Sequence, residues 1–223
     1  MTFSLVARCA RTGQFGMVIS SSSPAVAARC SHVRAGVGAV ASQNITDPEL
    51  GPLTLDAMAK GMDAVSAVQA VLSGYAPAAY RQVMAIDAAG TTFIQSGANI
   101  LGVWAEVKGV DCAAAGNLLA GADVPQAMVD AFQSSAAPFG DRLMAALTAG
   151  LAAGGEAGPV HSAGLKIADR LTWPYVDLRV DWSERPIGDL QGAWEVYKPQ
   201  ADAYVQRAIN PSGAPSYGVP GDQ

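Results

Sequence analysis

Charged residues are scarce in this sequence, at 15% against 50% hydrophobic residues. Disordered chains have the opposite balance, so this composition predicts a folded domain with a sizeable core. The 14 lysines and arginines are scattered without a run of three, and the formal net charge is −5. Because phosphate neutralisation by a basic surface supplies most nucleic-acid affinity, the sequence argues against a nucleic-acid partner.

Cysteine and histidine are also rare, with three and two residues respectively. No Cys-x-x-Cys pair is present, and an odd number of widely spaced cysteines argues against a disulfide framework. A structural zinc site would need more ligands than these residues offer. We therefore expect no metal and no other cofactor, and we interpret Cys9, Cys30 and Cys112 as small buried hydrophobic residues.

No apolar stretch approaches the roughly 20 residues that are needed to cross a bilayer. The first residues, MTFSLVAR, do not show the basic segment followed by an apolar segment that marks a secretory signal. The sequence therefore predicts a cytoplasmic protein that does not associate with a membrane.

The hydrophobic pattern alternates between groups of strands and pairs of helices. Strands are predicted at 3–9, 15–20, 36–43, 83–87, 91–97, 103–107, 110–115, 160–168 and 175–181, with helices starting at Thr54, Asp63, Asp123 and Pro186 and a helical pair filling 123–153. Paired helices between groups of strands favour two stacked sheets with helices outside. We therefore predict an α/β fold with four layers, α-β-β-α, in which residues 1–209 form one domain and 210–223 form a Pro/Gly-rich tail.

The common catalytic constellations are missing. No GxSxG turn accompanies His32 or His161, and we interpret His161 as a structural or rim residue. One mechanism needs no histidine, because an N-terminal threonine can use its own α-amino group as the base for its hydroxyl. That amine has an ordinary pKa of about 7.7–8.0, so much of it is neutral near pH 7. Thr2 follows Met1 directly, and removal of Met1 would create such a residue.

Several segments resemble one family. The opening TFSLVARCARTGQFGMVISSSS, HVRAGVGAVASQ at 32–43, GNLLAG at 116–121, the Ser-Ala step at 162–163 and VDLRVD at 176–181 are similar to the family called domain of unknown function 1028. The resemblance extends over about residues 2–195. It implies a proteasome-like N-terminal-nucleophile fold, which agrees with the four layers predicted above, and it favours Thr2 as the catalytic residue.

In proteasome-type enzymes a cation downstream of the nucleophile lowers the pKa of its amine. The nearest match in this sequence is Arg34, which can act only electrostatically because arginine stays protonated; a surface or dimer-interface arginine is the alternative. The acidic residue expected after the second strand is missing, since serines occupy 20–23. Ser22 is a candidate for a hydrogen bond within the site, and a solvated turn is the alternative.

Acyl transfer also needs donors for the developing oxyanion. Gly116 and Asn117 are candidates through backbone N–H groups and a side-chain amide, with a plain turn as the alternative, and Gln43 and Asn44 are second choices. Asp177 and Arg179 share one face of a strand. They are candidates for binding a substrate carboxylate, although such a pair is often structural.

Two functional hypotheses follow. The first is an amidohydrolase that cleaves a small amide or related C–N bond of a small-molecule substrate, with Thr2 as nucleophile. The second is a non-catalytic, homo-oligomeric binding or assembly protein on the same fold. We expect a homo-oligomer, such as a dimer, in either case, with Trp182, Trp194 and the tail as candidates for the interface.

Overall fold

A computed structural model describes residues 1–221 of the chain. Every strand pair in it is antiparallel. The larger sheet has the order β10 (Val176–Val180), β9 (Ser162–Ala168), β2 (Phe15–Ser21), β1 (Thr2–Arg8), β8 (Cys112–Asn117) and β7 (Ala105–Gly109), and the smaller has the order β3 (Ser31–Arg34), β4 (Gly38–Asn44), β5 (Arg81–Asp87) and β6 (Thr92–Ser96).

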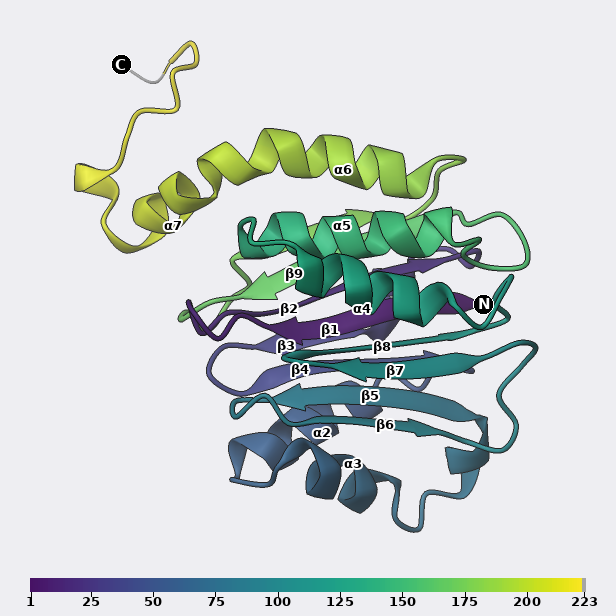
Figure 1. Ribbon diagram of the computed structural model, residues 1–223. Coiled ribbons are helices and arrows are strands. Elements are labelled where there is room, and N and C mark those ends of the chain that lie inside the picture. Colours follow the sequence, from purple (N-terminus) through teal and green to yellow (C-terminus); the bar gives the residue numbers. More distant parts are fainter. Residues whose placement is uncertain (222–223) are drawn as a thin grey trace.

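The two sheets lie face to face, with helices on both outer faces (Figure 1). The helices are α1 (Val26–Cys30), α2 (Leu50–Ala59), α3 (Ala64–Leu72), α4 (Val124–Ser134), α5 (Phe139–Ala152), α6 (Pro186–Tyr197) and α7 (Ala201–Ile209). Buried side chains of α4, α5 and α6 pack against the larger sheet, and those of α2 and α3 pack against the smaller one. This order of layers confirms the predicted α/β fold with two sheets between helices.

Alternation along each strand separates the cores. In β1, Phe3 and Leu5 face the helices, whereas Val6 faces the smaller sheet. The layer between the sheets is apolar over most of its area, with Met17 and Ile86 among its buried members. Because both faces of β1 and β2 are covered, their sequences are nearly continuous apolar runs, as expected for fully buried strands.

Helix boundaries agree with the sequence at Asp63, whose side chain accepts a hydrogen bond of 2.7 Å from the Ser66 N–H and caps α3. Thr54 does not start a helix. It lies inside α2 and donates its hydroxyl hydrogen bond to the Leu50 carbonyl four residues earlier, at 2.7 Å. A threonine side chain can bond backbone groups both at a cap and within a helix, and the apolar run from Leu50 decides the boundary here.

The end of the chain folds back on α7. Arg207 donates hydrogen bonds to the Pro215 and Ser216 carbonyls and lies over the Tyr217 ring, at 3.8 Å from its centroid. The predicted tail, 210–223, is thus in contact with the domain over part of its length, and 222–223 lie outside the described residues. Among residues 1–221, no helix has the length and apolar character needed to span a membrane.

Candidate functional site

Thr2 begins β1 and is buried, with 4% of its surface exposed. It pairs with Asn117 of β8, and it shares the inter-sheet face of β1 with Ser4 and Val6. Its hydroxyl donates a hydrogen bond to the Met1 carbonyl. The structure therefore places Thr2 at one end of the layer between the sheets, which is the end marked N in Figure 1.

A chain of hydrogen bonds runs from an arginine to the same carbonyl. Arg29 donates to the Ser23 hydroxyl at 3.0 Å, the Ser23 and Ser21 hydroxyls are 2.8 Å apart, and the Ser21 hydroxyl donates to the Met1 carbonyl at 2.5 Å. When Ser23 donates to Ser21, every bond points from the cation toward the carbonyl. Ser162 fixes this turn, because its hydroxyl donates to the Ser23 carbonyl at 2.6 Å. The carbonyl next to Thr2 is thus polarised by a buried hydroxyl.

A buried carboxylate, that of Glu156, contacts the chain directly after β2. It is buried, with 4% exposed, and both of its oxygens accept from the Ser22 N–H at 3.1 Å. Burial raises the pKa of Glu156 to about 7, against the lowering effects of the chain's amino terminus, the bonds from Ser22 and the charge of His161. A carboxyl group with this pKa exchanges its proton near neutral pH, as a general acid or base must.

Two glycines bring Glu156 to this position. Gly154 and Gly155 follow α5 and have positive φ angles of 111° and 59°, which lets the chain turn back toward the sheet. The returning segment then bonds the chain that follows β8: Ala120 N–H donates to the Gly155 carbonyl at 3.0 Å, and Ala157 N–H donates to the Leu118 carbonyl at 2.9 Å. The GNLLAG segment therefore holds the carboxylate at the Thr2 end.

Buried amides lie behind Thr2, between the sheets. Ser4 donates to Gln43 at 2.7 Å, and Gln43 donates to Gln82 at 2.8 Å. Asn117 also donates to Gln82, at 3.2 Å, while its own carbonyl oxygen is buried without a hydrogen-bond partner among the described residues. The structure thus brings Gln43 and Asn117 to the Thr2 end.

The residues predicted as oxyanion donors, Gly116 and Asn117, take part in other hydrogen bonds. One N–H of the Asn117 side-chain amide donates to Gln82, and its amide oxygen is buried without a hydrogen-bond partner among residues 1–221. Gly116 lies in a central strand, pairing with Phe3 on one side and Ala105 on the other, so its backbone takes part in the sheet. The Ser21 hydroxyl, by contrast, donates to the carbonyl beside Thr2.

Ser22 and Arg34 do not act as the sequence suggested. Ser22 contributes its backbone N–H, to Glu156, and it is Ser21 that shares the inter-sheet face of Met17 and Ile19. Arg34 pairs with Gly38 at the other end of β4 and forms an exposed ion pair of 2.8 Å with Asp56. This position is about 16 Å along the strand from Gln43, at about 3.3 Å per residue, so Arg34 is not the cation beside Thr2.

Asp177 and Arg179 lie on the edge strand β10, three strands from β1 and so about 14 Å from it. Each has its own partner: Asp177 accepts from Lys166 at 3.1 Å, and Arg179 donates to Asp181 at 3.1 Å. These separate ion pairs support the structural interpretation of the two residues rather than a carboxylate site with Thr2.

His161 does lie at the rim. Its backbone N–H donates to the Ser21 carbonyl at 2.8 Å, and its ring stacks on Trp182 at a centroid distance of 4.3 Å. Trp182 is 59% exposed, whereas Trp194 is buried and donates to Asp141 at 2.7 Å. Trp194 is therefore a core residue and is unavailable for the interface that the sequence suggested.

Comparisons with known proteins agree on the family. The model of the family of unknown function DUF1028 matches residues 2–190. The crystal structure of a protein from Silicibacter pomeroyi, described with the same family, has a TM-score of 0.86 and 28% sequence identity, covering 92% of this chain and 90% of that chain.

A second solved structure, Anbu (ancestral beta-subunit) from Yersinia bercovieri, aligns with a TM-score of 0.40 and 9% identity over 92% of this chain and 97% of that chain. This likeness is too low to carry an argument. The comparison with curated proteins found no match. The match over residues 2–190 shows that the chain belongs to the DUF1028 family.

Proposed function

We propose that the protein is an N-terminal-nucleophile amidohydrolase, with Thr2 as its nucleophile after removal of Met1. The observation that carries this proposal is the polarised carbonyl beside Thr2. Two hydroxyls, those of Thr2 and Ser21, donate to the oxygen of the peptide that precedes Thr2. A substrate carbonyl bound in the same place would meet the same donor and lie next to the Thr2 hydroxyl.

The reaction is the hydrolysis of a C–N bond in a small amide. The Thr2 oxygen attacks the carbonyl carbon while its proton passes to the α-amine. The C–N bond then breaks, the leaving amine takes up that proton, and water hydrolyses the ester on Thr2 to release the acid. The Ser21 hydroxyl stabilises the oxyanion, and Arg29 strengthens it through Ser23. No metal or other cofactor is required.

In this proposal, Glu156 and Asn117 interact with the α-amine of Thr2 that removal of Met1 frees. Glu156 is a proton acceptor with a pKa raised by burial to about 7, and the chain's amino terminus already interacts with it. The unpartnered oxygen of Asn117 lies in the residue paired with Thr2, where the amine of a freed Thr2 can donate to it. Both groups keep the α-amine of Thr2, which is the base, close to the Thr2 hydroxyl, which is the nucleophile.

The first test is a mass measurement on protein expressed without any N-terminal addition. Loss of one methionine exposes Thr2. A small β-lactone, whose ring opening acylates a hydroxyl nucleophile, is then the probe, and peptide mapping is the readout. We expect acylation of Thr2 in the wild type, acylation of serine in Thr2→Ser, and none at residue 2 in Thr2→Val. All three residues are small enough for Met1 removal.

Retention of Met1 would contradict the proposal, and so would equal acylation of Thr2→Val at another residue. Hydrolysis of a panel of small amides by the wild type and by Thr2→Val then separates catalysis from simple reactivity.

A second candidate, a homo-oligomeric binding or assembly protein, is favoured by exposed apolar side chains at the same end. Ile45, Tyr80 and Leu101 are each 45–46% exposed. Asn44 links their segments, since it donates to the Tyr80 carbonyl at 2.7 Å and accepts from the Leu101 N–H at 3.3 Å. Light scattering tests this candidate, because a monomer throughout the micromolar range would remove it.

A further inference from the structure

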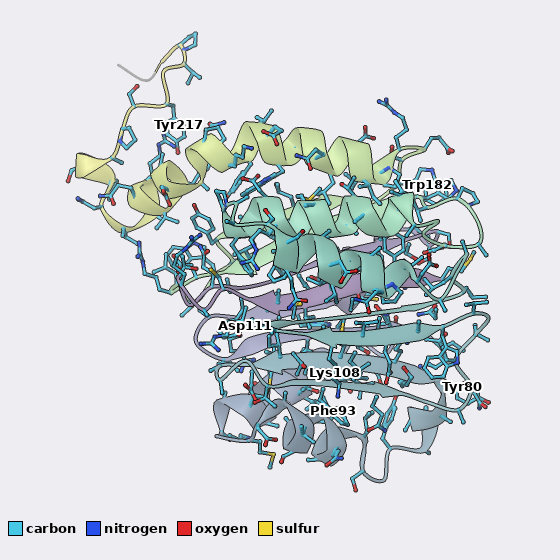
Figure 2. The ribbon with its side chains drawn as sticks, in the orientation of Figure 1. Tyr80, Phe93, Lys108, Asp111, Trp182 and Tyr217 are labelled. Atoms are coloured by element: carbon cyan, nitrogen blue, oxygen red, sulfur yellow. The ribbon has the colours of Figure 1, made fainter. Side chains whose placement is uncertain are left out.

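A cavity of about 300 Å³ opens at the end of the larger sheet that is opposite Thr2. Three connections form it: the turn after β1, the turn between β7 and β8, and the link from α4 to α5. Its lining residues include Arg8, Cys9, Arg11, Asp111, Gln133 and Arg142. In Figure 2, Asp111 lies on the side of the molecule away from Trp182 and Tyr80, which mark the Thr2 end. The cavity is therefore separate from the site described above.

Three arginines face a single carboxylate in this cavity, although the whole chain has a net charge of −5. Its residues come from positions far apart in the sequence, and only folding brings them together. The neighbours of the Cys9 thiol in this cavity also change its pKa. Burial raises its pKa, but hydrogen bonds with Thr12 and Arg11 and the charge of Arg11 outweigh that effect, and the pKa is lowered overall. With three arginines and one aspartate among its lining residues, the cavity is a positive region on an acidic protein.

Two of the guanidinium groups are fixed before any ligand arrives. Arg142 lies 3.9 Å from the centroid of the Phe132 ring, and its Nε donates to the Phe132 carbonyl at 3.1 Å. Arg8 forms an ion pair of 3.3 Å with Asp111. Gly90 packs against that pair, because a Cβ at this glycine would lie 2.5 Å from the Asp111 carboxylate and 2.8 Å from the Arg8 guanidinium. Rotation of these side chains is therefore restricted.

Donor groups remain for a ligand. Within residues 1–221, the terminal nitrogens of Arg142 and the whole guanidinium of Arg11 have no acceptor on the protein. Arg11 is exposed and can close over a bound group, whereas Arg142 is half-buried. Planar guanidinium groups bind carboxylate and phosphate oxygens through paired hydrogen bonds. Since small-molecule cavities start at about 300 Å³, the ligand that fits is small.

We propose that this cavity binds a small oxyanion with at least two negative charges, either a phosphate or a di- or tricarboxylate. Arg142 and Arg8 form the fixed wall, and Arg11 forms the mobile one. Binding here does not depend on Thr2, so the site stands or falls apart from the proposed hydrolase activity.

Isothermal titration at constant ionic strength tests the proposal, with inorganic phosphate, citrate and chloride as probes. We expect saturable binding of phosphate or citrate and none of chloride. Saturation with phosphate alone assigns a phosphate ligand, and saturation with citrate alone assigns a polycarboxylate. No saturation with any probe would overturn the site.

Variants locate the binding. Arg11→Gln removes an exposed guanidinium that has no partner on the protein, so the fold should be unaffected and binding should weaken about ten-fold. Arg142→Gln should weaken it at least as much. Arg185→Gln is the matched control, because Arg185 is also an exposed arginine but lies at the start of α6. An equal loss in Arg185→Gln would show general ionic attraction instead of a site.

Discussion

At one end of the six-stranded sheet a carboxylate is buried among hydroxyls and amides, whereas at the other end three guanidinium groups line an open cavity. The difference lies in how each end deals with charge. Glu156 is 4% exposed, and burial moves its pKa to about 7. Arg8 keeps 23% of its side chain exposed beside Asp111. Burial moves the pKa of a carboxyl group toward 7, so the group gains and loses its proton near neutral pH. A fixed and solvated charge keeps its sign and is suited to binding an opposite charge.

The largest expected effect comes from making the Thr2 end as apolar as the rest of the inter-sheet layer. Gln82→Leu removes the oxygen that accepts from Gln43 and Asn117. Buried donors without acceptors cost about 1–3 kcal/mol each, so we expect the free energy of unfolding to fall by about 3–4 kcal/mol in urea denaturation. Ser96→Ala removes one bond from Gln82 at the edge of the same network and one exposed bond to Glu106, and it should cost about 1 kcal/mol. Equal losses of unfolding free energy in Gln82→Leu and Ser96→Ala would show that the buried amides do not stabilise the fold as one network.

The second prediction concerns the pH dependence of stability. Glu156 has a pKa of about 7 in the folded protein against 4.5 ordinarily, so the folded state binds the proton more tightly. Stability is therefore highest below about pH 4.5 for this group, falls as the pH rises to about 7, and loses about 3 kcal/mol in total. Glu156→Gln has no charge to bury, and most of this fall should disappear when urea denaturation is compared at pH 5 and pH 8.

Glu184→Gln is the control for that measurement. Glu184 also lies beside His161, at 3.7 Å, but its side chain is 82% exposed. Glu184→Gln should leave the pH dependence of the free energy of unfolding as it is in the wild type. If the free energy of unfolding falls between pH 5 and pH 8 by the same amount in Glu156→Gln as in the wild type, a group other than Glu156 is responsible.

Two arginines distinguish the predicted site from the observed one. Arg29 reaches Ser21 through Ser23, whereas Arg34 is paired with Asp56 at the far end of β4. Under the proposed mechanism, Arg29→Gln should slow β-lactone acylation of Thr2 about ten-fold, because an indirect donor contributes less than a direct one. Arg34→Gln should leave the acylation rate unchanged. The reverse result would restore the assignment that was made from the sequence.

The sequence predicted β1 and β2 because they are continuous apolar runs with a clear turn between them, but it did not predict the four-residue strand β3. It also proposed Thr2 from its place after Met1 and from the family resemblance, and Gln43 and Asn117 from their places at strand ends; the structure puts all three at the same end of the layer between the sheets. It did not find Glu156, since the contact depends on two glycines with positive φ that turn the chain after α5. The alternation of side chains along β2 could have shown that Ser21, rather than Ser22, faces the smaller sheet, because Met17 and Ile19 lie on that face.

The far cavity could not be predicted for a related reason. The sequence has no basic cluster, and the arginines at 8, 11 and 142 meet only because the turn after β1 lies beside the start of α5. Pairwise spacing carries no information on such a contact. Charge that is scattered in the sequence can therefore be concentrated in the fold.

The smallest expected effect sharpens the comparison at the arginine end. Asp111→Asn removes the only carboxylate among the residues that line the cavity. Asp111 has a positive φ of 56°, which asparagine also adopts, and its ion pair with Arg8 is partly solvated, so the free energy of unfolding should change by less than about 1 kcal/mol. The cavity then gains a unit of positive charge and frees the Arg8 guanidinium. Binding of phosphate or citrate should strengthen several-fold in isothermal titration, and weaker binding would mean that the Arg8–Asp111 pair is needed to hold the wall in place.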